Sequence, residues 1–217
     1  MPGHVDARVG LSGRDDSTGA PLVRYALVLV GACAVGVFSD RGALLASPWS
    51  ALAEIGTPFV LVAFAAGRQP PRPGWGMVWG AVALGIGLAA YDAWMFLVQD
   101  VPWGTLTHGY RAGAWLAAGV VVGALAGACG AASRPGRGAA LRATGWGLLV
   151  ASPLAEGVRV SRWAPPATAA ALLLLVLAAG LYAWAVQRDR TPWQLAAVSV
   201  AAFAPALILA ETFRHLV

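Results

Sequence analysis

Long apolar stretches separated by short polar ones set the pattern of this chain. Seven apolar runs can be counted, each bounded by charged residues, proline or glycine. They cover residues 22–38, 51–67, 77–98, 114–132, 146–160, 168–186 and 194–213. Nearly charge-free runs of about 20 residues are typical of membrane-spanning helices. The pattern therefore predicts an all-α fold, a polytopic integral membrane bundle of about seven transmembrane helices.

Composition supports this interpretation. Of the 217 residues, 59% are hydrophobic and 12% are charged, whereas a soluble domain carries roughly 25% charged residues. The first residues are rich in Gly, Ser, Asp and Arg and contain no apolar stretch of the kind found in signal peptides. We therefore expect residues 1–21 to form a disordered cytoplasmic tail and residues 22–217 to form a single transmembrane helical domain.

The net charge of +5 comes entirely from arginine, because the chain contains no lysine. The N-terminal tail and the segments after the second, fourth and sixth runs hold about twice as many arginines as the opposite side. The positive-inside rule then predicts a multi-pass protein of the plasma membrane with a cytoplasmic N-terminus and an external C-terminus. The arginines are scattered between apolar runs rather than gathered on a polar face, which argues against a nucleic-acid partner.

Most acidic residues fall in the outer half of this bundle. Asp92 lies about two turns inside the end of an apolar run, where an ionised carboxylate costs about 2.5–3.5 kcal/mol. The outer half also contains Asp40, Glu54, Asp100, His108, Glu156, Glu211 and His215. We expect carboxylates from several spans to converge at this level. Asp92 and Glu54 have no basic partner nearby in the sequence, so each is either protonated or paired across the bundle.

Two of these acids do have local partners. Glu156 and Arg159 are three residues apart, and Glu211 is spaced to meet Arg214 or His215 on one helix face. Such pairs are either helix-end ion pairs at the membrane interface or parts of a site, and the spacing leaves both open. We include Glu156 among the candidate substrate-binding residues.

Aromatic side chains surround Asp92. Tyr91, Trp94 and Phe96 flank it, and Trp103, His108 and Arg111 follow. Electron-rich ring faces beside an acid are suited to holding a developing carbocation by cation–π attraction. Packing alone explains any single ring equally well.

Other chemistries have little support in the sequence. There is no Gly-rich phosphate loop, no HExxH, no CxxC and no GxSxG motif. With three histidines and no DDxxD-like cluster, we expect neither a metal site nor a cofactor. Cys33 and Cys129 lie within apolar runs and are expected to remain free thiols. Gly119, Gly123 and Gly127 share one helix face, which favours close approach of a neighbouring helix.

The chain resembles the small membrane-bound terpene cyclases, which include fungal meroterpenoid cyclases and bacterial indole-sesquiterpenoid counterparts. The resemblance lies in the length, the seven spans, Glu54 in the second run and Glu211 in the last. In that family, carboxylic acids protonate an epoxide or a terminal alkene of a prenylated substrate, and cyclisation follows without metal. The resemblance implies acid roles for Glu54 and Glu211, and Asp92 matches neither position. The chain also resembles actinobacterial integral membrane proteins, a likeness that implies no activity.

These observations lead to one leading hypothesis and two alternatives. The first is a terpene cyclase acting on a lipophilic prenylated molecule, with Asp92 or Glu54 as general acid and Glu211 as a second acid or orienting group. Tyr91, Trp94, Phe96 and Trp103 would line the cavity. The alternatives are a small proton-coupled transporter, whose buried acids relay protons, and a non-catalytic membrane protein whose outer carboxylates pair with arginines.

Overall fold

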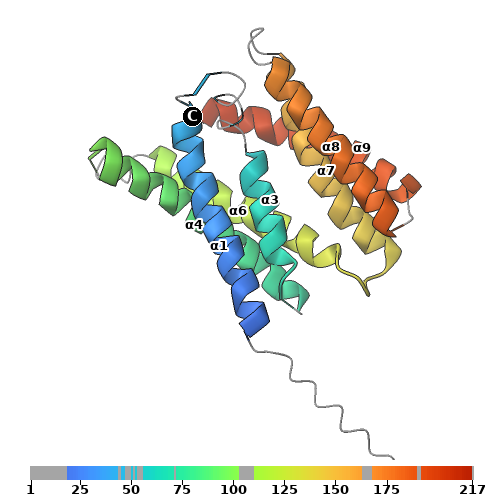
Figure 1. Ribbon diagram of the computed structural model, residues 1–217. Coiled ribbons are helices and arrows are strands. Elements are labelled where there is room, and N and C mark those ends of the chain that lie inside the picture. The colour runs from blue at the N-terminus through green and yellow to red at the C-terminus, as the bar shows by residue number, and fades with distance from the viewer. Residues whose placement is uncertain are drawn as a thin grey trace, which may run out of the picture.

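The computed structural model describes residues 19–43, 45–46, 50, 52, 56–70, 72–102, 110–162, 168–189 and 192–216. Seven α-helices run through this part of the chain, and each overlaps one of the apolar runs (Figure 1). They are α1 (Gly19–Ala43), α3 (Thr57–Gly67), α4 (Pro73–Gln99), α6 (Tyr110–Ala132), α7 (Ala139–Ser161), α8 (Thr168–Asp189) and α9 (Pro192–Leu216). The all-α prediction is confirmed. Residues 1–18 of the expected tail, Glu54, Trp103 and His108 lie outside the described residues, and residues 19–21 belong to α1.

Four of these helices, α1, α4, α6 and α8, are long and apolar enough to cross a membrane by length and composition. Helix α3 and the first part of α9 are shorter apolar helices. The large apolar side chains on their outer surfaces, such as Leu97, Val176 and Val200, are more than two-thirds exposed, as lipid-facing side chains are. The helices are thus compatible with a membrane protein, while the number of spans and the orientation stay predictions.

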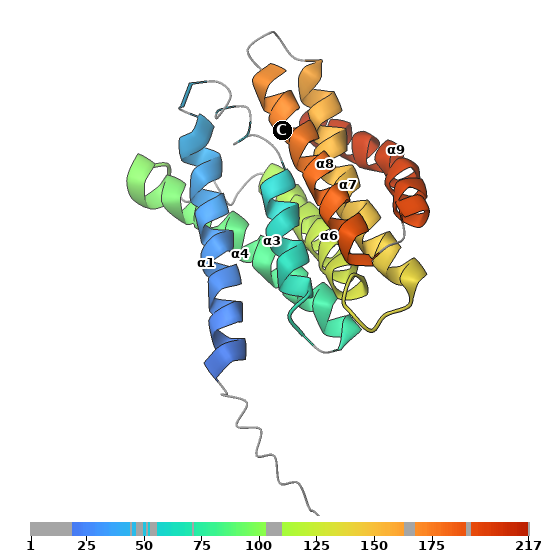
Figure 2. The ribbon, with the colours of Figure 1, turned by 45° about the vertical axis from the view of Figure 1, so that its right-hand side comes forward.

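The helices form two groups that meet at α6 and α3. In the first group, α4 packs against α6, α1 and α3. In the second, α7 lies between α8 and α9 and contacts both extensively (Figure 2). Helix α7 also packs against α6 and, more lightly, against α3. The second group therefore reaches the first through α7.

Helix α7 corresponds to the weakest apolar run, yet it is the most buried helix. It begins at Ala139, several residues before the run, and continues through Pro153, whose ring is fully buried. Because neighbouring helices surround it, α7 does not need an apolar face toward lipid. Glu156 and Arg159 are accommodated on it for that reason, since they face protein.

Glycines bring α6 against α4, as their shared face predicts. A Cβ atom placed on Gly123 would lie 2.7 Å from the carbonyl oxygen of Gly80 and 2.9 Å from the Cα of Ala81. A Cβ on Gly127 would overlap the backbone of Gly76 and lie 2.9 Å from the Cα of Gly80. Backbones this close leave no room for side chains, so the packing interpretation of the glycine face is confirmed.

We predict that Gly127→Val lowers the free energy of unfolding by about 1–3 kcal/mol, because the new methyl groups would overlap the backbone of α4. Gly113→Val is the matched control, since a Cβ at Gly113 of the same helix meets no atom within 4 Å. Thermal unfolding of the purified proteins in detergent measures the difference. Equal melting temperatures for the two variants would contradict the close α4–α6 contact.

Candidate functional site

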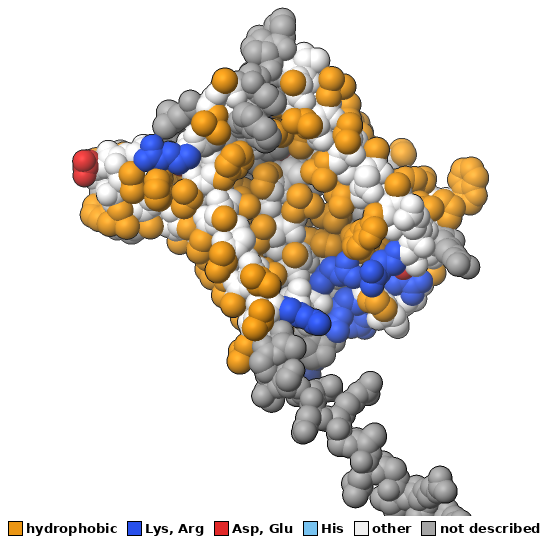
Figure 3. Space-filling model, in the orientation of Figure 1, with side chains coloured by type: hydrophobic (Ala, Val, Ile, Leu, Met, Phe, Trp, Pro, Cys, Tyr) orange, Lys and Arg blue, Asp and Glu red, His pale blue; other side chains and the backbone are white. Residues whose placement is uncertain are grey.

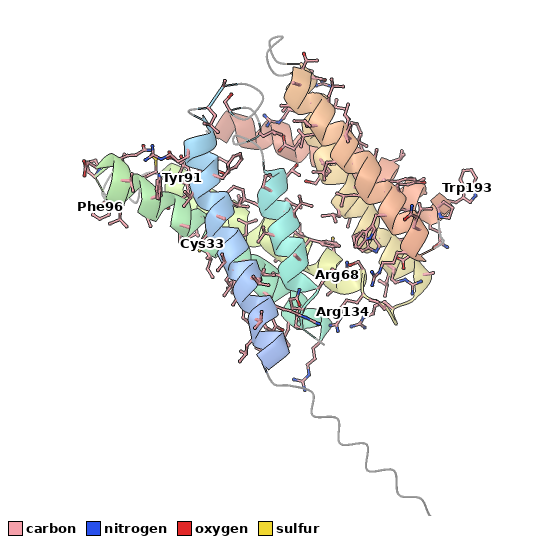
Figure 4. All side chains as sticks on the ribbon, in the orientation of Figure 1. Cys33, Arg68, Tyr91, Phe96, Arg134 and Trp193 are labelled. Atoms are coloured by element: carbon pink, nitrogen blue, oxygen red, sulfur yellow. The ribbon has the colours of Figure 1, made fainter. Side chains whose placement is uncertain are left out.

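Asp92 lies near the C-terminal end of α4, where α4 crosses α1. The two helices approach closely because both carry glycine: a Cβ on Gly36 would overlap the backbone of Gly87 and lie 3.0 Å from the backbone nitrogen of Tyr91. Tyr91 is consequently placed beside α1, and Phe96 lies farther along α4 (Figure 4). Phe96 is 43% exposed.

A second carboxylate, Asp40 of α1, belongs to the same cluster. The side-chain amide of Gln99 donates a hydrogen bond of 2.6 Å to Asp40 Oδ2. Arg41 Nε lies 4.0 Å from the same oxygen, and the Arg41 guanidinium lies 5.0 Å from the centroid of the Trp94 ring. Asp40 is thus compensated by a hydrogen bond and a nearby cation. Arg41 and Gln99 were not among the candidate residues from the sequence.

Asp92 differs from Asp40 in having no such compensation. Its side chain is partly buried, and no described residue forms a hydrogen bond or an ion pair with it. The Tyr91 side chain lies close enough to both Asp40 and Asp92 for the two carboxylates to act on its hydroxyl electrostatically. Trp94 Nε1 is buried, without a hydrogen-bond partner among the described residues. We call the set Asp40, Arg41, Tyr91, Asp92, Trp94 and Gln99 the α1/α4 cluster.

Glu156 belongs to a separate cluster on α7. Arg159 Nε donates a hydrogen bond of 2.8 Å to Glu156 Oε2, which confirms the pairing that the i,i+3 spacing predicts. The backbone N–H of Gly56 donates to Glu156 Oε1 at 3.2 Å. Glu156 is 9% exposed and Arg159 is 6% exposed. Both carboxylate oxygens therefore have protein donors, and they tie the start of α3 to α7.

The sequence predicts that carboxylates from several spans converge at one level. Among the described residues, they lie in these two separate clusters instead. No hydrogen bond or ion pair of the described part joins Asp92 to Glu156, since α4 packs on α1, α3 and α6 while α7 packs mainly on α8 and α9. Arg111 lies in the first turn of α6, and Glu211 near the end of α9; their side chains are outside the described set. Three predicted site residues (Glu54, Trp103, His108) are in undescribed segments.

Within the described residues, no three His, Cys, Asp or Glu side chains come together in a way that would hold a metal ion. Cys33 and Cys129 are free thiols. The α1/α4 cluster itself offers two carboxylates, a phenol, an indole, a guanidinium and an amide.

Comparison with known proteins places the chain in a family. The model of one protein family matches residues 15–216, nearly the full length. The chain belongs to DUF6518. This family is described as one of unknown function. No curated protein and no solved structure matches the chain. Membership in DUF6518 assigns no activity, so we infer function from the α1/α4 cluster.

Proposed function

We propose that this protein is a membrane-embedded, metal-independent cyclase that protonates a lipophilic prenylated substrate through Asp92. The observation that carries the proposal is the state of Asp92: a carboxylate in a helix apolar enough to span a membrane, without a hydrogen bond or ion pair from the described residues. Burial without a counter-charge favours the protonated acid, and a protonated carboxyl group is a proton donor.

The proposed reaction begins with transfer of the Asp92 proton to a terminal alkene carbon or to an epoxide oxygen of the substrate. The Asp92 O–H bond breaks as the new C–H or O–H bond forms, and the cation left on the substrate is attacked by an internal double bond, which closes a ring. The ring faces of Tyr91 and Trp94 are suited to stabilising that cation. Loss of a proton from the cyclised cation regenerates the acid and ends the reaction.

Other groups support this chemistry in the proposal. Tyr91 lies beside α1, and its ring forms part of the aromatic wall. Glu54 and Glu211, the positions that the terpene cyclase resemblance singles out, serve as a second acid or as orienting groups. Phe96 and Trp103 extend the aromatic wall.

The proposal includes the topology. We place the N-terminus in the cytoplasm and the C-terminus outside the plasma membrane, with seven spans. Support comes from the arginines Arg68, Arg134, Arg137 and Arg188, which lie at the ends of α3, α6 and α8. The alternation of helix direction brings these ends to one side of the molecule (Figure 1), as the positive-inside rule requires.

A proton-coupled transporter is the second candidate. It is favoured by one feature: the α1/α4 cluster contains two carboxylates, Asp92 and Asp40, and the partners of Asp40, Gln99 and Arg41, are both exposed. Buried acids that are close to an exposed surface are suited to relaying protons. Substrate-dependent proton uptake by proteoliposomes, lost on Asp92→Asn, would identify this function.

The cyclase is tested with membranes that contain the protein. Farnesyl-indole, geranylgeranyl-indole and an epoxidised prenyl quinol are supplied, and products are separated and identified by mass spectrometry and NMR. We expect a cyclised isomer of the same mass from at least one substrate, absent from membranes without the protein. If none of the three substrates is converted and proteoliposomes show substrate-dependent proton uptake, the protein is a transporter rather than a cyclase.

A further inference from the structure

Five arginines gather at the end of the molecule opposite to the α1/α4 cluster. Arg68 caps α3, Arg134 and Arg137 lie between α6 and α7, Arg142 is in the first turn of α7, and Arg188 is in the last turn of α8. Together they form a basic surface over the lower right of the molecule in Figure 3. We call these residues the arginine cluster. Asp189 is the one described carboxylate among them.

One oxygen of Asp189 is already paired, whereas Asp189 Oδ2 is buried without a hydrogen-bond partner among the described residues. Arg142 Nε lies 3.0 Å from Asp189 Oδ1, and Arg142 also donates a hydrogen bond of 2.6 Å to the carbonyl oxygen of Arg137. Arg134 donates to the carbonyl oxygen of Pro70. These contacts fix the α6–α7 connection against its neighbours. They leave the guanidinium groups of Arg68, Arg137 and Arg188 without a hydrogen bond or ion pair from any described residue, and Arg68 and Arg188 are the two that lie against aromatic rings.

Aromatic faces hold these two guanidinium groups in place. Arg68 lies 4.8 Å from the centroid of the buried Trp146 ring, and Arg188 lies 5.6 Å from the centroid of Trp184. The two indole rings meet edge to face at 4.6 Å. Stacking leaves the N–H groups of a guanidinium unsatisfied at its edge, where they are available to an anion.

The positive charges of the arginine cluster also favour binding of an anion. Burial lowers the pKa of the Arg68 guanidinium, and the nearby charges of Arg188 and Arg134 lower it further, against a partial offset from Asp189. Arginine nevertheless stays charged in proteins. Like charges held together at a partly buried position are therefore mutually repulsive, and a bound anion would relieve that repulsion.

We propose that Arg68 and Arg188 bind the phosphate group of an anionic phospholipid. Arginine presents paired N–H donors that match phosphate oxygens, and basic sites between transmembrane helices on the cytoplasmic side bind lipid headgroups. The position fits a lipid, since candidate span α8 ends at Asp189. Trp184 is 44% exposed and Trp193 is 85% exposed, and Trp193 projects outward from the start of α9 (Figure 4). Exposed tryptophans mark the headgroup level.

This inference rests on the proposed membrane placement and is independent of the proposed chemistry. Its test uses the full-length protein in a zwitterionic detergent. The melting temperature is measured with added phosphatidylglycerol, with phosphatidylcholine of the same acyl chains, and with inorganic phosphate. Native mass spectrometry counts the lipids retained. The variants are Arg68→Gln and Arg188→Gln, with Arg24→Gln as the control, because Arg24 is an exposed arginine near the start of α1.

We expect phosphatidylglycerol to raise the melting temperature more than phosphatidylcholine or phosphate does. We also expect Arg68→Gln and Arg188→Gln each to weaken phosphatidylglycerol binding by about tenfold, the loss of one strong charged contact. Arg188 is exposed, so its variant should fold even if Arg68→Gln does not. An equal shift with phosphatidylcholine would overturn the proposal. So would an equal shift with inorganic phosphate, which would assign the cluster to a free anion, or an equal loss in Arg24→Gln.

Discussion

The Asp92→Asn variant is expected to lose cyclisation activity by about 10²–10⁴-fold, the contribution of a positioned general acid. Asparagine keeps the size of the side chain and removes the transferable proton. No hydrogen bond or ion pair of the described structure involves Asp92, so the exchange should leave folding intact. Initial rates of product formation, normalised to the amount of protein in the membrane, measure the effect.

Asp100→Asn is the matched control for this experiment. Asp100 is an exposed carboxylate that caps the same helix, in the left-handed conformation with φ of 53°. Asparagine tolerates that conformation well, so this variant loses a charge without strain. It should retain full activity. Activity equal to the wild type in each of Asp92→Asn, Glu54→Gln and Glu211→Gln would show that the assigned acids are wrong.

The helices could be predicted from the sequence because each apolar run is long and clearly bounded. The largest difference in bounds concerns α7, which extends back to Ala139. Its first turns contain Arg142 and Thr144, which interrupt the apolar run, and Arg142 pairs there with Asp189 of α8. A run defined by hydropathy does not detect helical turns that are stabilised by contacts with another helix.

The site was only partly predictable, for a related physical reason. The Glu156–Arg159 pair follows from the geometry of one helix. The hydrogen bond from Gln99 to Asp40 and the stacking of Arg41 on Trp94 depend on where α1 crosses α4. That crossing is set by the contact of Gly36 with Gly87, and a single sequence does not indicate which glycine on one helix meets which on another. The same limit applies to Arg68 on Trp146.

The second large effect is expected at the buried ion pair of α7. Arg159→Gln should destabilise the protein by about 3–5 kcal/mol, because it leaves the Glu156 carboxylate, 9% exposed, without its closest cation. The melting temperature in detergent should fall accordingly. Arg72→Gln, which removes an exposed arginine before α4, should have little effect and controls for the change in net charge.

A double substitution tests whether the Glu156–Arg159 pair has only a structural role. Replacing both residues, Glu156→Gln with Arg159→Gln, removes the charges together, and the new side-chain amide on α7 keeps a carbonyl oxygen that can accept the Gly56 N–H. Much of the lost stability should return, so that the sum of the two single effects exceeds the double effect by about 1–3 kcal/mol. If the double variant also keeps full cyclisation activity, the α7 pair is structural, and catalysis rests with the α1/α4 cluster. A double variant that recovers its stability but is inactive would instead place Glu156 in the reaction.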